Sequence, residues 1–119
     1  MHKVNVVRSF DQVDGYWNPL IAGSLNGQDV KLVKCKGHFV WHHHEAEDEL
    51  FYVVKGRFVM EFRDRIVTLQ EGEFIIVQKG VEHRPFAEEE VWIMLFEPST
   101  TLNTGNVEHE LTKYNLQKL

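Results

Sequence analysis

The residues best suited to chemistry lie near the middle of the chain, where three histidines, His42, His43 and His44, follow one another. Seven histidines in 119 residues is a high count for a protein of this length. In a strand, alternate side chains share a face, so His42 and His44 should point one way and His43 the other. Two imidazoles on one concave face can bind a single metal ion, and these two are the first predicted ligands.

A carboxylate and a further imidazole lie where they could complete such a site. Glu49 follows a short acidic turn and begins the next apolar strand, and His83 comes just after a turn at Lys79-Gly80. Three imidazoles and one carboxylate suit one divalent transition metal, which could be Fe, Mn, Ni, Cu, Co or Zn, and leave two positions of an octahedral shell open. Open positions distinguish a catalytic or substrate-binding metal from a closed structural one.

The elements that must position these residues are short strands, because apolar residues recur with a period close to two through most of the middle of the chain. The strands predicted in this way are 30–35, 38–44, 49–54, 57–62, 66–69, 74–77 and 91–96. Glycine turns at a spacing of roughly ten residues predict an all-β antiparallel sandwich or barrel. In the tail, Val107, Leu111 and Tyr114 fall at helical spacing, which predicts at most one short C-terminal helix.

Composition restricts the class of protein further. A length of 119 residues predicts a single domain over 1–119. The net charge of −5 argues against nucleic acid and against an anionic membrane as partners. The longest apolar run, Val91–Phe96, is far shorter than the roughly 20 residues that span a bilayer. Cys35 is the only cysteine and no apolar signal core follows Met1, so we expect a cytoplasmic protein.

Residues that share a face with the predicted ligands should line a small-molecule pocket. Phe51 and Val53 share the parity of Glu49, and Pro85 shares that of His83. Plain core packing is the alternative role for these three side chains. Arg84 could anchor a substrate carboxylate or phosphate, although such arginines are more often surface charges. We expect no further inward-facing carboxylate or histidine beside the metal, so a catalytic base, where the chemistry needs one, would have to be Glu49 acting as a loose ligand.

The order and spacing of these motifs resemble those of small single-domain cupins of the cupin type-2 conserved barrel family. The first cupin motif runs from a glycine through His-x-His and a glutamate to a second glycine, and the second runs through two glycines to a histidine. The matching positions in this chain are Gly37, His42, His44, Glu49, Gly56, Gly72, Gly80 and His83. The first spacer is one residue short, Gln78 replaces a proline and Ala87 replaces an asparagine, but no ligand position is changed.

The resemblance implies a double-stranded β-helix, or jelly-roll, barrel with its core at about 27–97 and the metal inside. It also implies a metal-binding protein that acts on a small molecule, in the manner of either cupin dioxygenases or cupin isomerases and cyclases. A non-catalytic module that binds a small molecule or a sugar is the alternative, and the sequence leaves turnover undecided. Many small cupins are dimers, and apolar runs at Phe51–Val54 and Val91–Phe96 are consistent with a homodimer.

Overall fold

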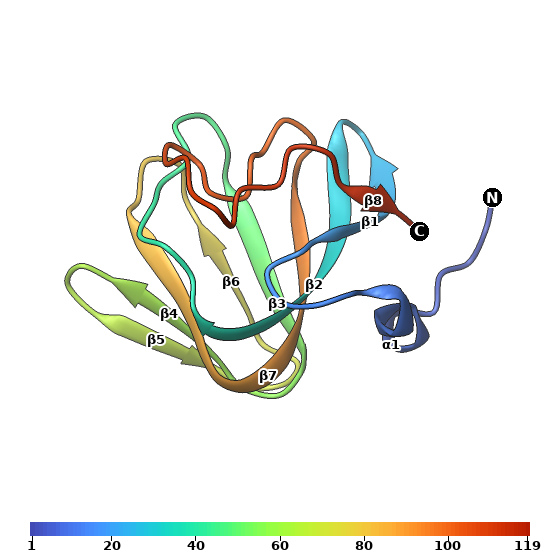
Figure 1. Cartoon of the computed structure of the whole chain (residues 1–119), viewed down its shortest axis with the longest axis horizontal. Helices are drawn as coiled ribbons and strands as arrows, with labels where there is room; N and C mark the ends of the chain where they lie inside the picture. Colours follow the sequence, from blue (N-terminus) through green and yellow to red (C-terminus); the bar gives the residue numbers. More distant parts are fainter.

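The computed structural model describes residues 1–119 and consists mainly of β-strands (Figure 1). Two short helical turns, α1 (Val6–Ser9) and the 3-10 helix η1 (Phe10–Gln12), precede the strands. The strands are β1 (Leu20–Leu25), β2 (Gln28–His38), β3 (Glu49–Lys55), β4 (Phe58–Phe62), β5 (Ile66–Leu69), β6 (Phe74–Val77), β7 (His83–Pro98) and β8 (Gln117–Lys118). No helix is long and apolar enough to cross a membrane.

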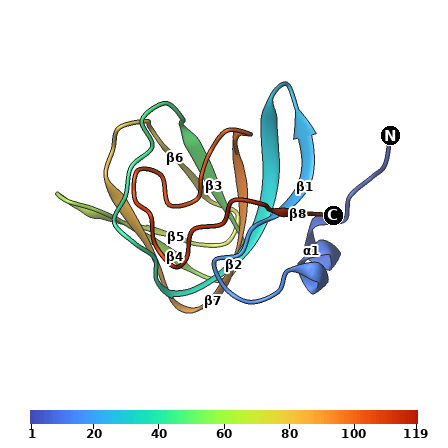
Figure 2. The same ribbon diagram turned by 45° about the horizontal axis from the view of Figure 1, so that its top comes forward.

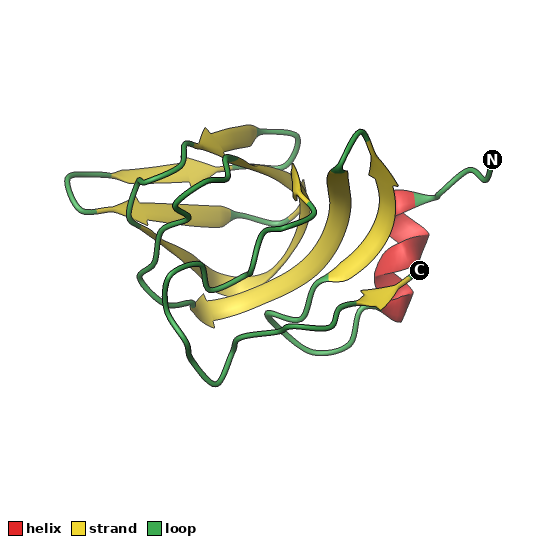
Figure 3. Cartoon of the chain, turned by 90° about the horizontal axis from the view of Figure 1, so that it is seen from above, coloured by secondary structure: helices red, strands yellow, loops and turns green.

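The long strand β7 connects the two halves of the barrel. On one side it pairs antiparallel with β2 along most of its length, and on the other with β4 near its start and with β3 near its end. One sheet path therefore runs β5-β4-β7-β2-β1-β8, while β3, with β6 beyond it, pairs with the same edge of β7 as β4, further along the strand. Figures 2 and 3 show these strands curving around a common interior, as the jelly-roll prediction requires.

A bulge allows β7 to bend from one half of the barrel to the other. Val91 pairs with Cys35 and Ala87 pairs with Gly37, so three residues of β7 stand opposite one residue of β2. These three residues, Glu88–Glu90, are all exposed. The acidic run is therefore solvated, as its charge suggests. It nevertheless belongs to a strand as a bulge, and for this reason β7 begins earlier than the sequence pattern indicates.

Alternation along the strands determines what faces the interior. In β3, Glu49, Phe51 and Val53 are buried, and β4 and β7 continue the same inward pattern. Fifteen buried residues from these strands and their neighbours form the main core. A second, smaller core lies on the outer face of the sheet, where Phe10 stacks on Trp92 with ring centroids 4.7 Å apart. The N-terminal turns thus cover one part of that outer face.

Two sequence predictions about secondary structure are wrong. The C-terminal segment contains no helix, since residues 99–116 form successive turns that are followed by the short strand β8. The segment 39–48, which carries the three consecutive histidines, is an irregular loop with a single β-bridge between His42 and His83. The predicted strand over 38–44 therefore does not exist beyond His38, where β2 ends.

Candidate metal centre

Backbone hydrogen bonds hold the histidine loop against the barrel, although the loop is not a strand. His42 and His83 exchange hydrogen bonds in both directions, with N···O distances of 3.1 and 2.9 Å. The N–H of Gly80 donates to the carbonyl oxygen of His44 at 2.8 Å. Glu49 and His83 are the first residues of β3 and β7, so strand ends position the other two side chains.

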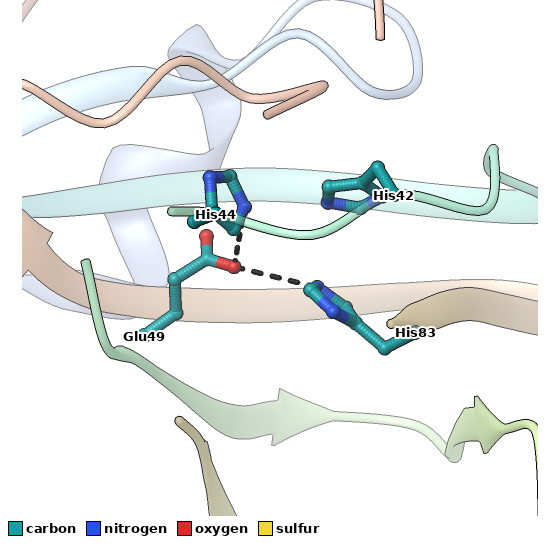
Figure 4. Close-up of side chains that lie close together, drawn as sticks. All are labelled: His42, His44, Glu49 and His83. Atoms are coloured by element: carbon teal, nitrogen blue, oxygen red, sulfur yellow. Dashed lines mark ion pairs between the residues drawn. The ribbon is translucent and has the colours of Figure 1, made fainter. Parts of the chain in front are cut away.

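The four predicted ligands meet inside the barrel. One ligand atom each from His42, His44, Glu49 and His83 lies within 4.8 Å of the others, and all four residues are buried. Glu49 Oε1 is 2.8 Å from His44 Nε2 and 3.4 Å from His83 Nε2 (Figure 4). The structure therefore brings together the set that the sequence pattern predicted, and this group could hold a metal ion.

Hydrogen bonds to backbone carbonyls fix the orientation of two of the imidazoles. His42 Nδ1 is 2.9 Å from the carbonyl oxygen of Val40, and His83 Nδ1 is 2.9 Å from that of Val81. A carbonyl oxygen only accepts, so each Nδ1 must carry a proton, and in the neutral imidazole Nε2 then keeps its lone pair. This is the arrangement in which a histidine presents Nε2 to a metal.

Three atoms of the cluster lack a hydrogen-bond partner. His44 Nε2, Glu49 Oε1 and His83 Nε2 are fully buried, yet none makes a hydrogen bond of acceptable geometry. Buried polar atoms are almost always satisfied, so unpartnered atoms converging on one point need an explanation. A cation at that point would satisfy all three, and nitrogen with carboxylate oxygen is a donor set for a first-row transition metal. The residues present therefore fit a metal.

The electrostatics of the cluster favour the protonation states that bind a metal. Burial, together with the charge of His83, lowers the pKa of His42 from 6.5 to about 4, so this imidazole is neutral near pH 7. Burial alone would raise the pKa of Glu49, but the close approach of Glu97, His44 and His83 outweighs it and lowers that pKa well below its usual value.

An apolar cavity of about 50 Å³ adjoins the cluster. His42 and Glu49 reach its wall, and Phe51 and Pro85 line it among mainly apolar side chains. Val53 does not line the cavity and is instead a fully buried member of the main core. Thus two of the three predicted lining residues face the cavity and the third has the alternative, structural role.

The expectation that no further carboxylate points inward is wrong. Glu97, near the end of β7, lines the cavity and is only 2% exposed. Its Oε1 accepts from Lys31 Nζ at 2.8 Å, and its Oε2 is buried without a partner. Burial, reinforced by Glu49, raises the pKa of Glu97 well above its usual value. Strand parity could have identified this residue, because Glu97 shares the inward face of β7 with Ile93 and Leu95.

The other singled-out side chains lie outside the cluster. Arg84 points away from the cavity, with its Nε 2.6 Å from Glu61 Oε1 and its guanidinium 5.2 Å from the ring centre of Trp41. His43 also points away, and its Nε2 is 2.7 Å from Glu45. The structure gives Arg84 an ion-pair partner and no contact with the cavity, so substrate anchoring by this residue stays a prediction.

Comparison with known proteins gives a consistent classification. The model of the cupin domain matches residues 30–97. A cupin-2 domain protein of Shewanella frigidimarina is 43% identical, with a TM-score of 0.78 over 80% of this chain and 93% of its own. The protein NMB1881 of Neisseria meningitidis is 32% identical, with a TM-score of 0.76 over 82% of this chain and all of its own.

A curated relative is matched over a shorter stretch. The uncharacterized protein YdbB of Bacillus subtilis is 34% identical over 61 residues, which are 50% of this chain and 54% of that protein. The match thus spans about half the length of this relative. The family match nevertheless covers more than half of the present chain and includes all four clustered residues, so the chain belongs to the cupin family.

Proposed function

We propose that this protein is a metal-dependent enzyme that acts on a small molecule inside the barrel. The observation that carries the proposal is the convergence of three buried, unpartnered atoms, His44 Nε2, Glu49 Oε1 and His83 Nε2. Together with His42 Nε2 they would hold one divalent transition metal. Such an ion supplies a Lewis acid, or a binding position for dioxygen, at its open coordination positions.

The cavity beside the cluster supports a small substrate. A volume of about 50 Å³ is well below the roughly 150 Å³ that accommodates benzene in a buried apolar cavity. Mainly apolar walls with a few polar groups are typical of sites that orient a small ligand, and the polar groups here are His42, Glu49, Glu97 and Asn103. The walls would exclude bulk water, and the polar groups would fix the orientation of the bound molecule.

Glu97 favours isomerase-like or cyclase-like chemistry over a dioxygenase-like reaction. Polarisation of a substrate carbonyl must be accompanied by proton transfer, and a group placed beside the substrate must accept that proton. Glu97 offers a carboxylate oxygen without a partner on the wall of the same cavity, while Lys31 holds its other oxygen. In this proposal Glu97 is the proton acceptor and Glu49 remains a ligand.

Turnover distinguishes an enzyme from the alternative, a non-catalytic binding module. We would load the chelator-treated protein with each candidate metal and incubate it with a panel of small hydroxycarbonyl compounds. Proton NMR would follow the substrates and an oxygen electrode would follow dioxygen. The proposal predicts more than one product molecule per chain, dependent on metal and absent in the His42→Ala/His44→Ala variant. Stoichiometric binding of an unchanged ligand would instead favour the binding module.

We also propose that the protein is a homodimer. On the outer face of the barrel, register places Ile76 beside Leu50 and Leu50 beside Phe96. Phe74, Ile76 and Phe96 are 58, 53 and 37% exposed, and β6 is an edge strand. A second copy packed on this face would remove apolar surface from water.

The cytoplasm is the proposed compartment, and the buried, unpaired thiol of Cys35 supports it.

A further inference from the structure

The histidine loop is held in place at three points, of which one lies on a strand and two lie outside the strands. His42 is fixed by β7 through its paired hydrogen bonds with His83, and His44 is fixed by the N–H of Gly80. His43, between the two predicted ligands, is fixed by neither of these segments. Its N–H donates to Asn106 Oδ1 at 2.9 Å, and its carbonyl oxygen accepts from the Asn106 N–H at 3.0 Å.

Asn106 belongs to a short segment, Leu102–Asn106, which we call the cap segment. Figures 1 and 2 show the C-terminal part of the chain, in orange to red, crossing the end of the barrel where the histidine loop lies. The cap segment lies outside the residues 30–97 that match the cupin domain. Asn103 of the same segment lines the metal cavity, so the cap segment contacts both the loop and the cavity.

Gly105 allows the cap segment to approach the loop closely. A Cβ atom at this position would overlap the carbonyl oxygen of His43 and lie 3.2 Å from Cδ2 of His42. The backbone φ of +56° also lies in the left-handed region that favours glycine. Any side chain at Gly105 would therefore push against the backbone of His43 and the ring of the predicted ligand His42.

The cap segment is itself firmly attached, so it can hold the loop. Asn103 donates to the carbonyl oxygen of Leu111 at 2.9 Å and accepts from the N–H of Lys113 at 3.0 Å. The hydroxyl of Thr104 is fully buried and lies 2.6 Å from that of Thr112. Leu111 packs against the main core. These contacts anchor the cap segment independently of the histidine loop.

We infer that the cap segment positions the metal ligands, with Asn106 as the positioning residue and Gly105 as the point of close contact. Because Asn106 binds both backbone groups of His43, it fixes the separation and direction of His42 and His44 on either side. The inference rests on the proposed metal binding and goes beyond it, since it assigns a role in the metal centre to residues outside the cupin match. Asn106 contacts no predicted ligand side chain and acts through the loop backbone.

The test compares Co²⁺ binding by four forms of the full-length protein. Asn106→Ala removes the acceptor for the His43 N–H, while Asn106→Asp keeps an oxygen there. Gly105→Ala introduces the overlapping Cβ. Tyr114→Phe is the control, because it removes an exposed hydrogen bond to Glu108 in the same C-terminal segment without affecting the loop. Dissociation constants for Co²⁺ and its visible absorption spectrum are measured for each form and for the wild type.

We expect Asn106→Ala and Gly105→Ala to bind Co²⁺ about 10- to 100-fold more weakly, as is typical when a group that orients metal ligands is lost. Their visible bands should shift, because ligand geometry changes, and a merely structural role would not alter the spectrum of the bound ion. Asn106→Asp and Tyr114→Phe should retain the wild-type affinity and spectrum. Asn106 is exposed, so its replacement leaves the core intact.

Two results would overturn the inference. Unchanged Co²⁺ affinity and spectrum in both Asn106→Ala and Gly105→Ala would show that the cap segment does not position the ligands, while metal binding itself would stand. Weak binding by Asn106→Asp equal to that of Asn106→Ala would show that the acceptor oxygen is irrelevant. Absence of Co²⁺ binding by the wild type would contradict both the proposed function and this inference.

Discussion

At the scale of single residues, the tautomers of the histidines make the cluster suitable for a metal. Nδ1 of His42 and Nδ1 of His83 each donate to the carbonyl oxygen two residues earlier in the chain. The same local hydrogen bond therefore orients both rings. Burial then keeps His42 neutral near pH 7. A neutral imidazole whose Nε2 keeps its lone pair can bind a cation without first releasing a proton.

The lowered pKa of His42 predicts how the metal-free protein responds to acid. The unfolded chain protonates this histidine near pH 6.5, and the folded chain only near pH 4. Between these values the unfolded state binds more protons, so the stability that is present above pH 6.5 falls as the pH approaches 4. Urea unfolding of chelator-treated protein at several pH values measures this loss. His42→Gln should reduce the pH dependence, and an equal slope in that variant would contradict the assignment.

The buried ion pair beside the cluster gives a second prediction at this scale. Lys31 and Glu97 are 3 and 2% exposed, so removing one partner leaves the other charge buried and unpaired. Glu97→Leu should lower the free energy of unfolding by about 3–5 kcal/mol, and the Lys31→Met/Glu97→Leu double variant should recover most of that loss. Urea unfolding of the metal-free forms measures both. A double variant no more stable than Glu97→Leu would show that the pairing is not the cause.

At the scale of elements, sequence patterning was a good guide to strands and a poor guide to loops. Period-two alternation located β3 to β6 closely, because each has one buried and one less buried face. It failed at the histidine loop, whose path depends on Asn106, 63 residues further along the chain. It also failed in the tail, where side-chain bonds such as Thr104 to Thr112 fix turns in place of a helix.

The four clustered residues were nevertheless predicted, for a partly different reason. His42 and His44 both face inward, but not because alternate residues of a strand share a face. They lie in a loop whose backbone is hydrogen-bonded at three points, and the bends of that loop direct both side chains inward. Glu49 begins β3, as expected, and His83 begins β7, which extends further toward the N-terminus than the predicted strand over 91–96. Glu97 was not predicted, because it follows an apolar run over 91–96 whose composition indicates packing alone, although its parity marks it as inward. The cap segment left no local signal, since its contacts are long-range.

The turn between β3 and β4 provides a prediction at the scale of elements. Gly56 has a φ of +96°, and a Cβ there would lie 3.1 Å from the carbonyl oxygen of Glu90 in the bulge of β7. Gly72 has a similar φ of +85° but nothing within 4 Å, so it is the matched control. Gly72→Ala should lower the free energy of unfolding by only about 1–2 kcal/mol, because alanine is strained in a left-handed backbone conformation. Gly56→Ala should lower the free energy of unfolding by more than Gly72→Ala does. Equal losses of stability for the two variants in thermal or urea unfolding would contradict close packing of Gly56 against the bulge.

At the scale of the whole molecule, the barrel has one outer face that the N-terminal turns cover and another that stays open. Phe10 and its neighbours cover the outer side of β2 and β7 around Trp92. The remaining part, over β3, β6 and the end of β7, leaves Phe74, Ile76 and Phe96 exposed. This uncovered apolar area is the basis for the proposed homodimer.

A single charge on that face tests the dimer. Ile76→Lys should convert the dimer to a monomer in light scattering coupled to size exclusion, because the lysine would have to be buried without a partner. Ile66→Lys is the control, since Ile66 is 64% exposed but lies on β5, at the far end of the sheet path. A monomeric wild type, or loss of the dimer in both variants, would contradict an interface over β3 and β6.

The metal content of the native protein tests the central claim most directly. Untagged protein, purified without chelator, would be analysed by inductively coupled plasma mass spectrometry beside His42→Ala/His44→Ala and His43→Ala. We predict close to one transition-metal ion per chain in the wild type and in His43→Ala, whose side chain points away from the cluster, and almost none in the double variant. No metal in the wild type, even after reconstitution with each of the six candidate ions, would contradict the account.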